Sequence, residues 1–238
     1  MQYDQQTPLG ILCADKFSVT PYSIFLLSCL TSENFSGKTI CDFGCGTGVI
    51  GLNIIANYKC NMIGIDVVQS AVELSRQNAQ KNGVEGAQFL TVEEFYTSPI
   101  YSSFDYIISN PASIPTPPTV EYNPFMDGGE EGDKMIVQMF QLANTFLKPD
   151  GQVLFLHTSL VSLQKTVQYL DKNGFMVSVE NIKQMEFRSY YRSYEYYWDS
   201  LRNKGQSFFF ENGGKRYELV YFLRLRRKNN CCIKEEIA

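Results

Sequence analysis

Glycines at every second position follow a short apolar run near the start of the chain. The run Thr39–Asp42 is typical of a β-strand, and Gly44, Gly46 and Gly48 follow it before a helical pattern begins at Val49. Alternate glycines permit a sharp turn and let the backbone approach a ligand closely, because a Cβ at these positions would occupy the ligand's space. Such a turn also presents backbone N–H groups and a helix start to that ligand. We therefore expect a nucleotide-type cofactor site here, at the first strand-to-helix turn of an open α/β sheet.

Two kinds of nucleotide fit the turn. Residues 46–51 match the G-x-G-x-x-G pattern of dinucleotide enzymes, with Asp66 near the distance expected for a ribose-binding acid. Asp42, however, places an acid at the end of the first strand, two residues before Gly44. The resulting Asp-x-Gly-x-Gly-x-Gly pattern resembles motif I of the class I S-adenosylmethionine (SAM) methyltransferases. We favour SAM as the cofactor and keep an NAD(P) enzyme and a glycine turn without a ligand as alternatives.

The resemblance implies roles for residues at the ends of three strands. Asp42 would serve the methionine end of SAM, and Asp66, which ends the predicted strand Asn61–Asp66, would accept hydrogen bonds from the ribose hydroxyls. The alternative for Asp66 is capping of the next helix. After the third strand, Glu94 or its neighbour Glu93 would border the adenine, with a solvated loop charge as the alternative. The cofactor-binding residues that we predict are Asp42, Gly44, Cys45, Gly46, Gly48, Asp66, Val67, Glu94 and Asn110.

A second motif follows the predicted strand Tyr106–Ser109. The sequence Asn110-Pro111-Ala112-Ser113 resembles the Asn-Pro-Pro-aromatic motif of the release-factor glutamine methyltransferases and their relatives. The resemblance implies that Asn110 and Pro111 are catalytic, because the Asn110 side-chain oxygen and the Pro111 carbonyl would accept hydrogen bonds from the acceptor NH2. Ala112 and Ser113 replace the second proline and the aromatic residue, so the motif leaves the substrate class open. The alternative is that Asn110 only starts a turn before proline.

Strand and helix patterns alternate along the chain, which indicates an α/β fold with helices on both faces of a doubly wound, mostly parallel sheet. The family resemblance also implies that the last strand of the sheet is antiparallel to its neighbours. We expect a single domain over residues 1–238, with a helical N-terminal segment over 1–38 and a long loop over 110–132. The further strands predicted are Gln88–Val92, Gln152–His157, Phe175–Ile182 and Tyr217–Leu225, and the helices are Ile24–Leu30, Val49–Asn57, Ser70–Asn82, Lys134–Leu147 and Leu160–Lys172.

An aromatic-rich insertion, residues 187–216, separates the last two predicted strands. Within it, aromatic side chains recur at helical spacing from Arg188 to Lys204, which predicts an amphipathic helix. The aromatic face can pack on the domain or on the second subunit of a homodimer. It can instead form a lid, because tyrosine offers both an apolar ring and a hydroxyl to an acceptor. The substrate-binding residues that we predict are Tyr190, Tyr191 and Tyr194.

The amino-acid composition limits which partners and which cellular compartment we expect. The net charge of −4 makes a nucleic acid an unexpected partner, because nucleic-acid binders normally show a basic face. Seven cysteines without a Cys-x-x-Cys pair, and His157 as the single histidine, predict no metal site. His157 can act as a base or simply end its strand in a hydrogen bond. With no apolar stretch long enough for a bilayer and no leader pattern, we expect a cytoplasmic protein without membrane contact.

Together these patterns predict an active SAM-dependent methyltransferase that modifies a nitrogen of a small molecule or of a protein side chain. Positioning would supply most of the rate, because a sulfonium is already a strong electrophile toward a neutral amine. Two alternatives remain: O-methylation of a small molecule, and a SAM-binding pseudoenzyme that serves as a partner subunit.

Overall fold

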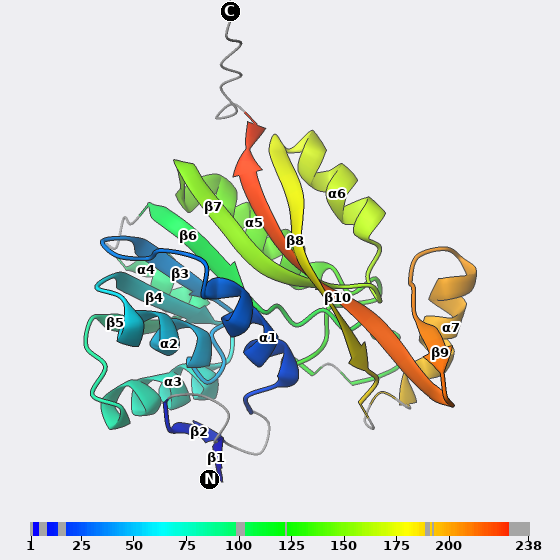
Figure 1. Ribbon diagram of the computed structural model, residues 1–238, viewed down its shortest axis with the longest axis horizontal. Coiled ribbons are helices and arrows are strands. Elements are labelled where there is room, and N and C mark those ends of the chain that lie inside the picture. The colour runs from blue at the N-terminus through cyan, green and yellow to red at the C-terminus, as the bar shows by residue number, and fades with distance from the viewer. Residues whose placement is uncertain are drawn as a thin grey trace, which may run out of the picture.

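The computed structural model describes residues 2–4, 9–13, 18–98, 103–121, 123–188, 191 and 193–228. Strands and helices alternate along these ranges (Figure 1). The helices are α1 (Pro21–Leu30), α2 (Val49–Asn57), α3 (Gln69–Lys81), α4 (Val92–Thr97), α5 (Lys134–Phe146), α6 (Leu163–Lys172) and α7 (Glu195–Asn203). The strands are β1 (Gln2–Asp4), β2 (Ile11–Cys13), β3 (Thr39–Phe43), β4 (Asn61–Asp66), β5 (Ala87–Thr91), β6 (Phe104–Ser109), β7 (Leu147–Thr158), β8 (Phe175–Glu186), β9 (Phe210–Asn212) and β10 (Lys215–Arg227).

One mixed sheet crosses the described part of the molecule in the order β5-β4-β3-β6-β7-β10-β8. The strands from β5 to β7 are parallel neighbours, whereas β10 runs antiparallel to both β7 and β8. The short strand β9 pairs with the start of β10. The predicted α/β class, the mostly parallel sheet and the antiparallel last strand are therefore confirmed. The segment 1–38 is not purely helical as predicted, because β1 and β2 pair with each other and β2 packs against α3.

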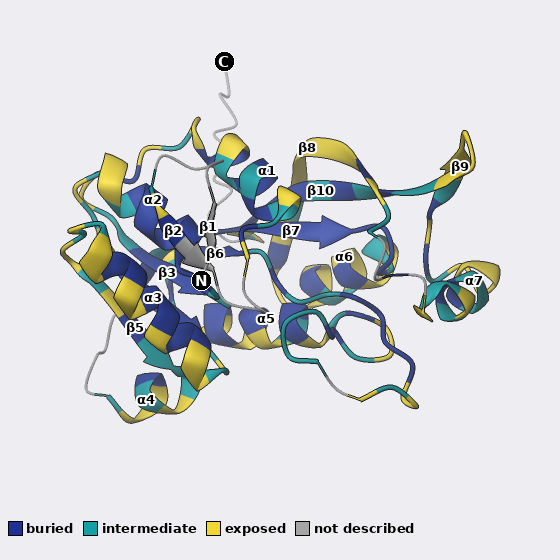
Figure 2. Ribbon diagram, turned by 90° about the horizontal axis from the view of Figure 1, so that it is seen from below, coloured by how far each residue is buried: buried dark blue, intermediate teal, exposed yellow. Residues whose placement is uncertain are grey.

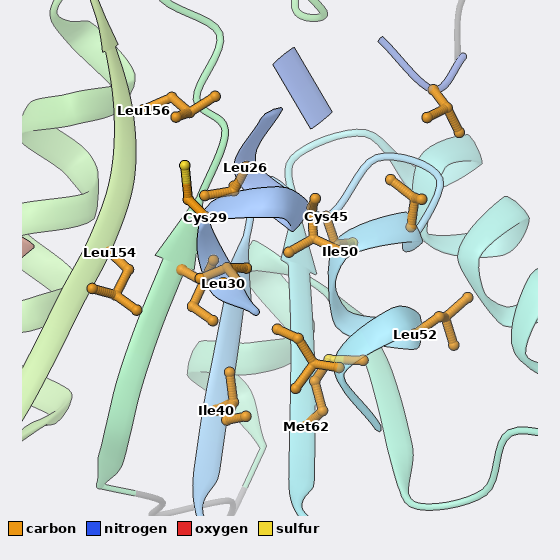
Figure 3. Close-up of a cluster of buried hydrophobic side chains, with 14 of the residues drawn as sticks. Leu26, Cys29, Leu30, Ile40, Cys45, Ile50, Leu52, Met62, Leu154 and Leu156 are labelled. Carbon is orange, nitrogen blue, oxygen red and sulfur yellow. The ribbon is translucent and has the colours of Figure 1, made fainter. Parts of the chain in front are cut away.

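Helices cover both faces of the sheet and create two separate cores (Figure 2). On one face, Leu26 of α1 and Ile50 of α2 pack with Ile40 of β3 (Figure 3). On the other face, Phe95 of α4 packs in one cluster with Phe140 of α5. Successive strand residues point to opposite faces, so a sheet covered on both sides needs strands that are apolar throughout. In the described ranges no helix is long and apolar enough to cross a membrane.

Pairing with β6 extends β7 beyond its predicted start. The helix predicted over Lys134–Leu147 ends one residue early, and β7 begins at once at Leu147. Residues 149–151, interpreted from the sequence as a helix stop, lie inside this strand. Leu147 pairs with the first residue of β6, and Lys148 Nζ lies 2.7 Å from Asp105 Oδ2. These tertiary contacts override the local preference of the proline and glycine for a turn.

Two helix starts also differ from the prediction, and side-chain caps explain both. No helix was predicted after β5, yet α4 begins there with a capping box: Thr91 Oγ1 accepts from Glu94 N at 3.1 Å, and Glu94 Oε2 accepts from Thr91 N at 2.8 Å. α6 begins at Leu163 rather than Leu160, because Ser162 caps it. Six residues are too few for helical periodicity to reveal α4 in the sequence.

The aromatic insertion contains a shorter helix than predicted. The helix expected over Arg188–Lys204 is wrong in extent, since α7 spans only Glu195–Asn203. Before α7, Tyr191 N donates to Arg188 O at 2.9 Å. α7 lies beyond one end of β8 and β10, the end where β9 pairs with β10 (Figure 1). The insertion therefore extends the sheet at one end.

A third cluster of buried side chains joins this insertion to the loop 110–132. Trp198 is 0% exposed, and its Nε1 donates a hydrogen bond to Pro115 O at 2.7 Å. Within the loop, Ile114 N donates to Met126 O at 2.9 Å and joins its two sides. α7 therefore packs on the domain, in agreement with the packing alternative for the aromatic face. The buried members of the cluster are Ile114, Leu160, Tyr191, Trp198, Leu201 and Phe209.

We expect Trp198→Phe to lower the free energy of unfolding by about 1–3 kcal/mol, because it leaves the buried Pro115 carbonyl without its donor. Urea unfolding would measure the change. The matched control is Tyr196→Phe on the same helix, where the side chain is 61% exposed and the expected change is within about 0.5 kcal/mol. Equal effects of the two substitutions would contradict the anchoring role of Trp198.

Candidate active site

Three parallel strands end at one edge of the sheet and open onto a cavity. β3 pairs in register with β4 through Phe43 and Ile65, and with β6 through Asp42 and Ile108. A cavity of about 330 Å³ lies at this edge, which is within the size range of small-molecule sites. The predicted site residues that line it are Asp42, Gly44, Cys45, Gly46, Asp66, Val67, Asn110, Pro111 and Tyr191.

The glycine turn has the left-handed geometry that its sequence predicts. Gly46 and Gly48 have φ of 56° and 76°, which residues with a side chain rarely adopt. A Cβ on Gly46 would meet no protein atom within 4 Å, so this position is open toward the cavity that it lines. A Cβ on Gly48 would lie 3.1 Å from atoms of Phe89 and Ser75. Gly48 does not line the cavity, and packing explains why it is glycine.

The backbone N–H groups of the turn donate to other protein groups, whereas the sequence predicted that they face a ligand. Gly44 N and Cys45 N both donate to Ile65 O, at 2.8 and 3.1 Å, and Gly46 N donates to Asp66 Oδ2 at 2.9 Å. A pyrophosphate site needs such donors for its own oxygens. With these three N–H groups engaged by β4, the turn offers close approach rather than anion binding, which disfavours a dinucleotide.

Two carboxyl groups border the turn. Asp42 is 2% exposed, and its Oδ2 accepts a hydrogen bond from Gly51 N at 2.9 Å. Asp66 accepts from Gly46 N through Oδ2 and from Val68 N, at 3.0 Å, through Oδ1. Burial raises the pKa of Asp42 to about 7 and also raises the pKa of Asp66. A bonded carboxylate oxygen keeps a second lone pair, so both groups can still accept hydrogen bonds from a ligand.

Glu94 lies away from the cavity lining. Its Oε2 accepts from Thr91 N in the capping box of α4 and lies 3.0 Å from Arg76 Nη2. The Thr91 backbone hydrogen bond and the Arg76 guanidinium hold the pKa of Glu94 below its ordinary value. The structure therefore gives Glu94 a helix-capping position and does not bring it to the other predicted cofactor residues.

Asn110 stands at the end of β6, and α1 holds its amide. Asn110 Nδ2 donates to Ser23 Oγ at 3.4 Å, and Pro111 lies buried beside it. The end of β6 is tied to β3, because Ser109 Oγ donates to Phe43 O at 2.7 Å. Since the amide nitrogen faces Ser23, the side-chain oxygen is the part of Asn110 that a ligand can use.

The three predicted substrate tyrosines have different outcomes. Tyr191 lines the cavity, and its hydroxyl lies 3.1 Å from that of Tyr22 on α1. Tyr194 is absent from the cavity lining and stacks on Trp198, with ring centroids 6.0 Å apart. Tyr190 lies outside the described residues.

A carboxyl group that the sequence analysis missed lines the cavity from β10. Glu218 is 0% exposed. Its Oε1 accepts from the Tyr22 hydroxyl at 2.6 Å, and its Oε2 accepts from the Thr158 hydroxyl. Burial raises the pKa of Glu218 from its ordinary value of 4.5 to about 7. One acid inside the apolar strand pattern of residues 217–223 was the signal that could have revealed it.

His157 borders the cavity from β7 but turns its ring toward α6. Its Nε2 lies 3.0 Å from Thr166 Oγ1, and the side chain is fully buried. Burial lowers the pKa of His157 to about 4, so the imidazole is neutral at physiological pH. This arrangement fits a hydrogen-bonded strand end better than a base that acts on a ligand.

The doubly wound sheet, the glycine turn and the acids at its carboxyl edge define a class I methyltransferase. Residues 5–185 match the family model of the methyltransferase small domain. The chain therefore belongs to the methyltransferase small domain family and is an enzyme of the SAM-dependent methyltransferase class.

Two relatives illustrate how much of the chain is shared. A candidate protein N5-glutamine methyltransferase of Methanocaldococcus jannaschii is 28% identical over 161 residues, which cover 66% of this chain and 79% of that protein. The ribosomal protein L11 methyltransferase of Photorhabdus laumondii is 36% identical over 90 residues, which cover 38% of this chain and 30% of that protein. The second likeness therefore concerns only a part of each chain.

Solved structures share the fold. The E. cuniculi Mtq2–Trm112 complex, responsible for methylation of the termination factor eRF1, matches with a TM-score of 0.58 at 15% identity, over 89% of this chain and 98% of that chain. The ribosomal protein L11 methylase of Lactobacillus delbrueckii matches with a TM-score of 0.52 at 15% identity, over 87% and 79% of the two chains. At these identities the likeness concerns the architecture alone.

We expect Asp66→Asn to weaken SAM binding about 10- to 100-fold, because a charge-assisted hydrogen bond is worth about 1.5–3 kcal/mol. Calorimetric titration would measure the dissociation constant. Glu94→Gln makes the same chemical change outside the cavity and should leave that constant unchanged. Unaltered affinity for SAM in Asp66→Asn would contradict a cofactor role for Asp66. Weaker SAM binding in Glu94→Gln would show that Glu94 contacts the cofactor.

Glu218→Gln should stabilise the fold at high pH. Because the folded-state pKa of Glu218 is raised from 4.5 to about 7, its contribution to stability is complete below pH 4.5 and is lost as the pH rises through about 7. At 1.36 kcal/mol per pH unit, ionisation at pH 8 costs about 3 kcal/mol. Glutamine avoids this cost, because it carries no charge.

Urea unfolding at pH 4.5 and pH 8 would test this expectation. The stability gained by Glu218→Gln should be up to about 3 kcal/mol larger at pH 8 than at pH 4.5. The control, Glu186→Gln, removes an exposed partner of Lys215, and its effect should be small at both pH values. A gain from Glu218→Gln that does not depend on pH would show that Glu218 ionises in the fold without cost.

Proposed function

We propose that this enzyme transfers a methyl group from SAM to a nitrogen atom of a protein side chain or of a small molecule. One observation carries the proposal: a single cavity brings the glycine turn, Asp42 and Asp66 together with Asn110. The first three form a cofactor end, and Asn110 belongs to an acceptor end. Methyl transfer requires these two ends to meet.

At the cofactor end, each residue has a separate task. Gly46 leaves room for the ligand, since a Cβ there would point into open space. Asp66 would accept hydrogen bonds from the ribose hydroxyls, and Asp42 would face the methionine part, whose positive charge suits a buried carboxylate. Bound SAM supplies a methyl group on a positively charged sulfur. The residues named here fit it because Asp42 and Asp66 line the cavity beside the glycine turn, where the N–H groups of Gly44, Cys45 and Gly46 already donate to the protein.

At the acceptor end, Asn110 would orient the nitrogen. Ser23 engages the Asn110 amide NH2, so the amide oxygen can accept a hydrogen bond from an acceptor N–H group, and the Pro111 carbonyl can accept another. Two oriented acceptors place the nitrogen lone pair toward the methyl group, which is the positioning that this reaction needs. The names of the relatives, which concern glutamine in proteins and a translation termination factor, support a nitrogen acceptor of a protein.

Labelled SAM would test the proposal directly. Incubation of the enzyme with [methyl-³H]SAM and a lysate separated into small-molecule, protein and nucleic-acid fractions should label the protein or the small-molecule fraction. Treatment with mild alkali distinguishes the products, because methyl esters are hydrolysed and N-methyl groups remain. SAM binding without label in any fraction would instead support the pseudoenzyme alternative.

Asn110→Ala should lower kcat by about 100-fold or more, the size expected when one oriented hydrogen bond to a reacting group is lost. The affinity for SAM should stay near that of the wild type, because Asn110 orients the acceptor. Asn144→Ala, an exposed amide on α5, is the matched control and should change neither value. Wild-type turnover in Asn110→Ala would show that Asn110 is only a turn residue.

A further inference from the structure

The Glu218 carboxyl group is buried in the cavity wall against neutral partners. Both of its oxygens accept hydrogen bonds from hydroxyl groups, those of Tyr22 and Thr158. No ammonium or guanidinium of the described residues lies within 4 Å of it, although Arg188 lines the same cavity. A buried carboxylate without a cation is costly, because hydroxyls replace only part of its hydration. The cavity is the space from which a positive group can reach it.

Aromatic rings line the cavity together with this carboxyl group. Tyr22 is central, because its hydroxyl contacts both Glu218 Oε1 and the Tyr191 hydroxyl, at 2.6 and 3.1 Å. Phe125 of the loop 110–132 also lines the cavity. Aromatic faces attract organic cations, and a carboxylate adds its charge to this attraction. This combination of groups favours an alkyl ammonium ligand over an anion or a neutral amide.

Helix α1 connects Glu218 to the predicted transfer point. Tyr22, which donates to Glu218, is followed in the chain by Ser23, which accepts from the Asn110 amide. Two consecutive residues of one helix therefore bridge the new carboxyl group and the acceptor motif. Asn110, Glu218 and Asp42 all line the same cavity. A small ligand group between them can face Asn110 and Glu218 together.

We infer that Glu218, with Tyr22 and Tyr191, binds the methyl acceptor as an aliphatic ammonium group and takes one proton from it. The inference rests on the nitrogen methylation proposed above and specifies the acceptor. An ammonium of this kind belongs to a lysine side chain or to a free alkylamine. Ser113 agrees with this assignment, because the motif lacks the aromatic residue that would stack on a planar amide.

The proton transfer makes the acceptor reactive. The acceptor R–NH3+ gives one proton to the Glu218 carboxylate, which leaves R–NH2 and a neutral carboxyl group. The nitrogen lone pair then forms a bond to the methyl carbon while the carbon–sulfur bond breaks and its electron pair stays on sulfur. R–NH2–CH3+ and S-adenosylhomocysteine leave, and the carboxyl group returns its proton to solvent. The raised pKa of Glu218, about 7, suits a group that must gain and lose a proton near neutral pH.

A binding experiment separates this role from turnover. Calorimetry would titrate Nα-acetyl-lysine methylamide into the enzyme saturated with S-adenosylhomocysteine, and Nα-acetyl-glutamine methylamide would serve as the neutral probe. We expect the lysine probe to bind the wild type at least 10-fold more tightly than the glutamine probe, and Glu218→Gln to abolish this preference. Glu186→Gln, an exposed acid on β8, should retain it. Equal affinity of the wild type for the two probes would overturn the inference.

The labelled product provides the second measurement. Acid hydrolysis releases volatile methylamine from an N-methyl amide, whereas an N-methyl alkylamine survives it. We expect the label to survive, in the protein fraction for a lysine acceptor and in the small-molecule fraction for a free amine, and Glu218→Gln to lower its incorporation at least 100-fold. Release of the label as methylamine, or wild-type incorporation by Glu218→Gln, would overturn the inference and leave the proposed function intact.

Affinity for SAM keeps the two proposals distinguishable. Glu218→Gln should bind SAM as the wild type does, and a large loss would assign Glu218 to the cofactor and overturn its acceptor role. The fold of the variant is verified by the unfolding measurements described for the site. A wild-type enzyme that binds no SAM, or that labels no fraction, would refute the proposed function itself.

Discussion

The in-register pairing of β3 with β4 and β6 fixes where the groups of the candidate site lie. Because parallel strands present their carboxyl ends at one edge, Asp42, Asp66 and Asn110 meet although up to 44 residues separate neighbours in the chain. The glycine turn depends on the same pairing, since Ile65 of β4 accepts hydrogen bonds from two of its N–H groups. A slip of one residue in either pairing would turn these side chains to the other face of the sheet.

Burial of acids determines the electrostatics of the cavity. Asp42, Asp66 and Glu218 all line it, and the pKa of each is raised because the charged form loses hydration. Among the described lining residues these three carboxyl groups stand against the guanidinium of Arg188, and this excess of acids suits cationic ligands. The same three carboxyl groups lower the free energy of unfolding near neutral pH. Binding of a positively charged ligand would therefore raise the free energy of unfolding.

Much of the fold could be predicted because its signals are local. The apolar strands, the acids that end them and the glycine spacing identify the class. They also single out four residues that all line the cavity, namely Asp42, Gly46, Asp66 and Asn110. Tertiary contacts account for the failures. The turn-like residues 149–151 lie within β7 because Leu147 before them and Gln152 after them both pair with β6, with an irregularity of the register between the two pairs. The helix in the aromatic stripe begins only at Glu195. The capping box that engages Glu94 could not be read from its position after β5, and the contact of Glu94 with the adenine stays a prediction.

Glu218 and Tyr22 escaped prediction for a related reason. They are 196 residues apart in the chain, and neither belongs to a motif. Only the antiparallel pairing of β10 with β7, and the packing of α1 beside them, brings these groups together. A sequence pattern describes neighbours along the chain, whereas this contact depends on the complete sheet.

The Trp198–Pro115 hydrogen bond has a consequence for how such an enzyme can diversify. It fastens the insertion to the loop 110–132. The cavity wall beside Asn110 therefore combines segments that follow Asn110 in the chain with Tyr22 and Ser23 of α1, whereas the glycine turn, Asp42 and Asp66 all precede Asn110. With the roles proposed above, substitutions in the insertion and in the loop can accumulate in evolution while the segments of the glycine turn keep their sequence. A lineage can then acquire new acceptors stepwise, with each intermediate still holding the same methyl donor.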